Sequence, residues 1–115
     1  MLGAQSSKAS LPLNGVTVLF QGDSITDVGR NIFDGNDLGS GYPFLIAEAF
    51  NSKFPLKNVQ FLNRGMSGNT VSELRLRWQK DCLDLKPDVV SIIIGVNDVL
   101  GKFFWSNYEE RNFEA

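Results

Sequence analysis

The residues best suited to chemistry are three turn-forming residues that follow an apolar run. Gly22, Asp23 and Ser24 come directly after residues 16–20 and Gln21. A β-branched run of this length is typical of a strand buried on both faces of a parallel sheet. Ligands of open α/β sheets bind at the carboxyl ends of such strands, so Ser24 is placed to act as a nucleophile. Because these residue types are also the commonest in turns, this segment taken alone favours a simple turn.

Two more polar loops that contain glycine follow apolar segments. Residues 63–70 follow the strand-like residues 59–62, and residues 95–98 follow the apolar run 89–94. Acyl transfer requires a nucleophilic oxygen and donors that meet the developing oxyanion. Gly68 offers a backbone N–H with no side chain to block close approach, and Asn97 offers a side-chain amide. Together the three loops predict a catalytic site formed by Ser24, Gly68 and Asn97.

The elements that must position these residues alternate between strands and helices. At most one helical turn is expected within the long loop 25–41, before Pro43 begins a helix that should end ahead of Pro55. Thr70 begins a second helix through a capping box, and Ser106 begins a third. The order β-α-β-α-β-α implies right-handed crossovers. We expect a flavodoxin-like three-layer α/β/α fold with a parallel sheet and strand order 2-1-3.

The second predicted helix is amphipathic. Its apolar stripe is expected to face the core, with its cysteine packing as a small hydrophobe. The stripe consists of Val71, Leu74, Trp78, Cys82 and Leu85. Its charged residues form three i,i+4 pairs, which we interpret as a solvated face. These pairs are Glu73 with Arg77, Arg77 with Asp81, and Lys80 with Asp84. Arg30 and Arg64, in the preceding loops, are expected to be solvated surface residues, with contact to a substrate anion as the alternative.

Composition argues against several classes of partner. The 115 residues carry a net charge of −2, which gives no electrostatic reason to expect binding to nucleic acid or an anionic membrane. No apolar run is long enough to span a membrane, and no signal-peptide pattern is present, so a cytoplasmic location is expected. Residues 1–14 are interpreted as a mobile segment ahead of one domain over residues 15–115. No metal or cofactor is expected.

The three loops together resemble the sequence blocks of the SGNH (GDSL) hydrolase family of esterases and lipases. The matching blocks are residues 22–24, 63–70 and 95–98. The resemblance implies that Ser24 is the nucleophile, and that Gly68 and Asn97 complete the oxyanion hole. It also implies a small-molecule ester as the substrate.

Three neighbours of these residues complete the candidate site. Asp23, Gly65 and Asp98 are expected to contact the substrate. Each has an alternative role. Asp23 could accept hydrogen bonds from loop amides, and Asp98 could cap the following turn. Gly65 is the less favoured donor of the second block.

The chain departs from the family pattern because it contains no histidine. The family's Asp-x-x-His block, which supplies the general base, is absent, so the chain alone should be nearly inactive. Family members also extend further, so residues 15–115 resemble the N-terminal part of such a domain, with the remaining strands missing.

The apolar run 89–94 would form an exposed sheet edge in the strand order 2-1-3. We expect further polypeptide, a partner chain or a second copy to cover this edge, because an exposed apolar edge invites aggregation. The alternative is that the aromatic residues Phe103, Phe104 and Trp105 fold back over it.

Three other functions stay open on the sequence. One is a non-catalytic flavodoxin-like module in which Ser24 and Thr26 bind a phosphate or flavin. Another is a receiver-like domain in which Asp23 and Asp98 bind Mg²⁺. The last is a fragment that only binds a partner.

Overall fold

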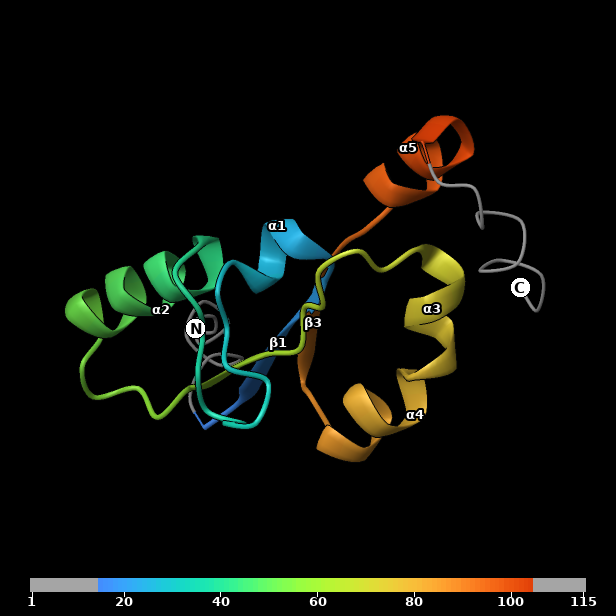
Figure 1. Cartoon of the computed structure of the whole chain (residues 1–115). Helices are drawn as coiled ribbons and strands as arrows, with labels where there is room; N and C mark the ends of the chain where they lie inside the picture. The colour runs from blue at the N-terminus through green and yellow to red at the C-terminus, as the bar shows by residue number, and fades with distance from the viewer. Residues whose placement is uncertain (1–14, 105–115) are drawn as a thin grey trace, which may run out of the picture.

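The computed structural model describes residues 15–104 of the chain (Figure 1). The segment 1–14, Trp105 and the helix predicted from Ser106 lie outside the described residues. The strands are β1 (Thr17–Gly22), β2 (Gln60–Asn63) and β3 (Val89–Ile93). The helices are α1 (Ser24–Asp27), α2 (Tyr42–Lys53), α3 (Val71–Leu76), α4 (Trp78–Asp81) and α5 (Val96–Phe104), with a 3₁₀ turn η3 at Leu83–Leu85.

The sheet has the predicted topology. β1 pairs in parallel with β2 on one side and with β3 on the other, which confirms the order 2-1-3. Leu19 of β1 lies opposite Leu62 of β2 and Val90 of β3. β1 extends through Gln21 and Gly22, beyond its predicted end at residue 20, because these residues continue the ladder with β3.

Helices cover both faces of the sheet (Figure 1). On one face, Leu19, Leu62 and Cys82 form the core with Trp78 and Leu85 packed against it. On the other, the Phe20 ring lies edge-on to Tyr42 of α2 and stacks on Phe61. Leu19 and Phe20 face opposite sides, as successive strand residues do. The three-layer α/β/α architecture is therefore confirmed.

The first two predicted helices meet different outcomes. α2 begins beside Pro43 and ends before Pro55, as predicted. The capping box is also present: Thr70 Oγ1 accepts from Glu73 N, and a Glu73 carboxylate oxygen accepts from Thr70 N at 3.0 Å. However, the single helix predicted to follow is divided into α3, α4 and η3. The backbone leaves helical geometry at Arg77 (φ −107°, ψ 10°) and again at Cys82 (φ −139°, ψ −69°).

A helix that the sequence analysis did not predict follows β3. α5 starts at Val96, inside the segment that was expected to be a loop, because Gly95 (φ +132°) turns the chain directly from β3 into a helix. The N–H groups of Asp98 and Val99 both donate to the Gly95 carbonyl. Asn97 therefore lies in the first turn of α5.

The outer edge of β3 is uncovered within residues 15–104. Val89, Ile92 and Ile93 are each more than 40% exposed. α5 extends away from the sheet, and its Phe103 and Phe104 are 74% exposed (Figure 1). For these two rings, the alternative of folding back over the edge is therefore wrong; Trp105 and the helix predicted from Ser106 lie outside the described residues. No helix in this described part of the chain is long and apolar enough to cross a bilayer.

Candidate active site

Ser24 is presented to solvent at the carboxyl end of β1. It is the first residue of α1 and is exposed, whereas Asp23 before it is fully buried. Asp23 caps α1, with its Oδ1 accepting from Ile25 N at 3.0 Å. A Cβ atom at Gly22 would lie 2.2 Å from the Ile93 carbonyl oxygen, so only glycine fits where β1 passes closest to β3. This turn fixes the position of the Ser24 backbone.

The loop after β2, residues 63–70, is hydrogen bonded to the turn that holds Ser24. We name these two segments the glycine loop (residues 63–70) and the nucleophile loop (residues 22–28). Met66 N donates to the Gly22 carbonyl at 3.0 Å. The N–H and hydroxyl of Ser67 donate to Asp27 Oδ2 at 3.0 and 2.9 Å. Asn63 Nδ2 donates to the Thr26 carbonyl at 2.8 Å. The Asp27 side chain and the carbonyls of Gly22 and Thr26 thus fix the glycine loop beside Ser24.

Gly68 lies at the open side of the glycine loop. Its φ of +86° is in the left-handed region, and a Cβ atom built on it would meet no atom of the described residues within 4 Å. The space in front of this residue is therefore open, and a small ligand could approach its backbone.

Asn97 joins the third loop to the glycine loop. It is 8% exposed, and its Nδ2 donates to the carbonyl oxygen of Asn69, the residue after Gly68, at 3.0 Å. The nucleophile loop, the glycine loop and the start of α5 consequently meet at one end of the sheet (Figure 1). Ser24, Gly68 and Asn97 all lie on these joined segments.

The structure gives Asp23, Gly65 and Asp98 contacts within the protein. Asp23 makes the α1 cap, and its second oxygen, Oδ2, is buried and has no hydrogen-bond partner among residues 15–104. Gly65 is buried; its N–H donates to Asn63 Oδ1 at 2.8 Å. Asp98 accepts from Val71 N at 3.0 Å, which ties α5 to the start of α3. Asp23 and Gly65 thus make these contacts within their own loops, whereas Asp98 joins two segments distant in sequence.

Two arginines interpreted as solvated are also anchored to loop carbonyls. Arg30 donates through Nε and Nη2 to the Gly65 carbonyl at 3.2 and 2.7 Å. Arg64 Nη1 donates to the carbonyls of Gly35 and Asn63 at 2.9 and 3.0 Å. Both residues are partly exposed, so each is a surface residue that also closes a loop.

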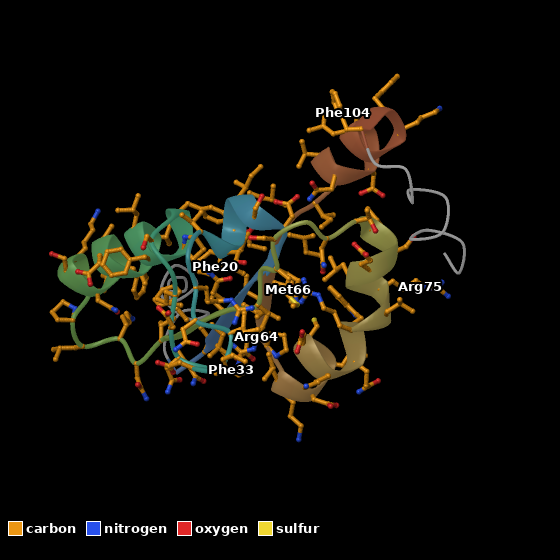
Figure 2. All side chains as sticks on the ribbon, in the orientation of Figure 1. Phe20, Phe33, Arg64, Met66, Arg75 and Phe104 are labelled. Carbon is orange, nitrogen blue, oxygen red and sulfur yellow. The ribbon has the colours of Figure 1, made fainter. Side chains whose placement is uncertain are left out.

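These arginines line a cavity of about 370 Å³ beside the loop 30–37. Phe33, Arg64 and Met66 mark its position in Figure 2. Ser24, Gly68 and Asn97 are not among its lining residues. Burial lowers the pKa of Arg30; Asp27 opposes this effect, and the nearby guanidinium groups of Arg64 and Arg77 add to it.

Arg77 is the residue that sequence reasoning missed. The predicted pair with Asp81 exists at 3.1 Å, but the Arg77 side chain is only 14% exposed, so the solvated interpretation is wrong. It donates to the nucleophile loop and the glycine loop as well as to Asp81. The available signal was Gln21, a polar residue in an otherwise apolar strand, which needs a buried partner.

The carboxylates of the receiver-like alternative do not form a metal site. Within residues 15–104, no three side chains of His, Cys, Asp or Glu are grouped in a way that could hold a metal ion. The Asp23 carboxylate accepts a hydrogen bond from Ile25 N, and the Asp98 carboxylate accepts one from Val71 N. The structure therefore gives no support to Mg²⁺ binding by this pair.

Comparison with known proteins identifies the family. A model of the GDSL-like Lipase/Acylhydrolase family matches residues 20–115. An acetylxylan esterase from Geobacillus stearothermophilus is 41% identical over 84% of this chain and 43% of its own length. The structure of an acetyl xylan esterase from the same organism superimposes with a TM-score of 0.79 at 38% identity, over 88% of this chain and 49% of that one.

A second solved structure gives the same result. An alpha/beta hydrolase enzyme from the metagenome of Lake Arreo in Spain superimposes with a TM-score of 0.76 at 39% identity, covering 82% of this chain and 47% of that one. The chain thus spans about half the length of the relatives it matches. By this match and by its fold, the chain belongs to the GDSL-like lipase/acylhydrolase family.

Proposed function

We propose that the protein containing this chain is a serine esterase that hydrolyses a carboxylic ester through an acyl-enzyme. The Ser24 oxygen attacks the ester carbonyl, the bond to the alcohol breaks, and water then releases the acid. The Gly68 N–H and the Asn97 amide donate to the oxyanion. The observation that carries the proposal is the hydrogen bonding that joins the loops of all three residues at one sheet end.

The Asn97 amide suits this role. An amide nitrogen carries two hydrogens, and among the described residues its side chain makes one hydrogen bond, to the Asn69 carbonyl. That bond fixes the direction of the second N–H. A donor that is oriented before the reaction stabilises the transition state without a cost of reorganisation.

The general base is proposed to come from polypeptide that follows this chain. The 115 residues contain no histidine, and carboxylates with a pKa near 4 are poor bases for an alcohol at neutral pH. The uncovered edge of β3 supports the same proposal. Beside it lies a largely apolar groove of about 360 Å³, which is lined by Val71, Leu74, Arg75, Trp78, Ile92 and Ile94. Further strands and helices would fill this groove and carry an Asp-x-x-His base to Ser24.

The substrate is proposed to be an acetyl or other short acyl ester of a carbohydrate or lipid. Similarity to an acetylxylan esterase supports the carbohydrate ester. Rates on p-nitrophenyl acetate, butyrate and octanoate would define the acyl length. Acetylated xylo-oligosaccharides would test the alcohol. A preference for octanoate over acetate would contradict the short-acyl proposal.

Covalent labelling of the full-length protein tests the mechanism. A fluorophosphonate should modify Ser24, and peptide mass spectrometry would locate the adduct. Ser24→Ala should abolish both labelling and esterase activity. Ser40→Ala is the matched control, because Ser40 is also exposed but lies outside the three joined loops. A folded full-length protein that carries the histidine and is not labelled at Ser24 would contradict the proposal.

A further inference from the structure

Arg77 occupies the break between α3 and α4, with its side chain directed into the loops behind the site. It is 14% exposed, and its guanidinium donates to five acceptor atoms of the described residues, with the two Nη1 hydrogens shared among three of them. Arg75, two residues earlier on α3, is exposed and points outward (Figure 2). The two arginines therefore differ in environment, although both lie in one short helical segment.

The guanidinium holds the end of β1. Arg77 Nη2 donates to the Gly22 carbonyl at 3.1 Å, and Nη1 donates to Gln21 Oε1 at 3.0 Å. The same Gly22 carbonyl accepts from Met66 N. Gly22 is two residues from Ser24, so Arg77 fixes the backbone from which the nucleophile projects.

The same guanidinium holds both ends of the glycine loop. Nη1 donates to the Arg64 carbonyl at 2.7 Å, and Nε donates to Asn69 Oδ1 at 2.6 Å. Asn69 follows Gly68 directly, and its carbonyl accepts the Asn97 amide at 3.0 Å. Asn69 therefore links the two residues, since its side chain accepts from Arg77 and its backbone carbonyl accepts from Asn97.

These contacts use the particular geometry of arginine. Its donors form a rigid planar fork, whereas lysine offers three donors from a single nitrogen. All three guanidinium nitrogens of Arg77 are engaged, in different directions. Asp81, at 3.1 Å, supplies the opposite charge that permits burial. Burial lowers the pKa of Arg77, and the hydrogen bond and charge of Asp81 oppose this effect.

We propose that Arg77 is a positioning residue for the ester hydrolysis, setting the placement of Ser24, Gly68 and Asn97 relative to one another. The inference rests on the proposed esterase function and names a residue that acts through others, since its contacts are with the loops. A misplacement of about 1 Å at reacting groups can reduce a rate about 10²-fold. Arg77 should therefore affect kcat more than KM.

Kinetics of Arg77→Met and Arg77→Lys in the full-length protein test the proposal. We expect Arg77→Met to lower kcat about 100-fold with KM changed less than about threefold, and Arg77→Lys to lower kcat about tenfold. Arg75→Met controls for loss of one positive charge two residues away, on α3. Leu74→Ala controls for lost stability, because Leu74 is buried and has no polar atom to donate to the loops. All rates are measured well below the midpoint of thermal unfolding of each variant.

An NMR measurement distinguishes a positioning role of Arg77 from a general loss of protein stability. It also tests that role independently of the esterase function. The side-chain amide signals of Asn97 in an ¹⁵N–¹H spectrum should shift in both Arg77 variants and stay in place in Arg75→Met. Unchanged Asn97 signals, or a kcat loss no larger than that of Leu74→Ala, would overturn the inference. Failure of Ser24 to react with the fluorophosphonate would overturn the esterase proposal instead, and the Asn97 signals would still decide on positioning. If Arg77→Met does not fold, the proposal is tested by the kinetics and the Asn97 signals of Arg77→Lys. This variant keeps the positive charge opposite Asp81.

Discussion

Gly65 and Gly68 lie three residues apart in one loop, and the structure gives them opposite surroundings. A Cβ atom at Gly65 would lie 2.7 Å from Asp27 N and 2.8 Å from Thr26 Cβ. At Gly68 the same atom would meet nothing within 4 Å, although the φ of +86° disfavours a side chain. Gly65 thus permits two loops to pack, whereas Gly68 keeps a space open.

Alanine at the two glycines should separate packing from catalysis. Gly65→Ala is expected to cost about 3 kcal/mol of unfolding free energy through overpacking. Gly68→Ala should cost only about 1–2 kcal/mol through backbone strain, yet lower kcat about tenfold or more because a methyl group enters the open space. Urea unfolding and esterase kinetics on the full-length protein measure both. Equal losses of stability in Gly65→Ala and Gly68→Ala would contradict the different roles given to the two glycines.

Asn97 should contribute mainly to the rate. Asn97→Ala removes the proposed oxyanion donor, so kcat is expected to fall about 10²–10³-fold. The Asn69 carbonyl also loses its hydrogen bond, which should cost about 1 kcal/mol of stability. Steady-state kinetics and thermal unfolding check the two effects. Val99→Ala, an exposed residue two positions later in α5, is the control and should leave kcat unchanged.

At the scale of elements, the short helix α3 depends on its capping box. α3 has only six residues, too few to be stable by helix propensity alone. Thr70 is fully buried and exchanges backbone and side-chain hydrogen bonds with Glu73. Arg77 lies at the break that follows α3, beneath the loops. The start of α3 therefore also fixes where the Arg77 guanidinium lies.

Removing the cap should destabilise the protein measurably. Thr70→Ala is expected to lower the unfolding free energy by about 1 kcal/mol, the usual value of an N-cap side chain. Ser52→Ala, at an exposed position near the end of α2, should change it by less than about 0.5 kcal/mol. Urea titration followed by circular dichroism compares the two. An unchanged midpoint for Thr70→Ala would show that the cap contributes nothing.

For the whole molecule, the apolar surface of β3 is the dominant feature. Val89, Ile92 and Ile93 are exposed, and a groove of about 360 Å³ lies between this strand and the helices α3 and α4. Unpaired strand edges and apolar surface of this kind promote association between chains. The chain covers only 43% of the acetylxylan esterase to which it is similar. We therefore expect the remaining polypeptide to pack here.

A charge on β3 should distinguish the isolated chain from the longer protein. Residues 1–115 alone should self-associate, and Ile92→Lys should reduce this association in sedimentation velocity experiments. In the full-length protein the same change should lower stability by about 2–4 kcal/mol, because a charge would be buried. Leu56→Lys is the control, since Leu56 is 95% exposed and distant in sequence from β3. A full-length protein indifferent to Ile92→Lys would show that β3 stays uncovered.

The sequence by itself determined the sheet, its order, the start of α2 and the capping box at Thr70, because local apolar runs, proline and side-chain caps specify them. It also pointed to the loops of Ser24, Gly68 and Asn97, because parallel strands end at one sheet edge. Only the tertiary structure decided what Arg77, Arg30 and Arg64 do. Their charges look solvated along the chain. The partners of Arg30 and Arg64 are backbone carbonyls, which carry no residue-specific signal, and most partners of Arg77 lie in segments distant in sequence. The helix is divided at Arg77, the residue that makes these long-range contacts.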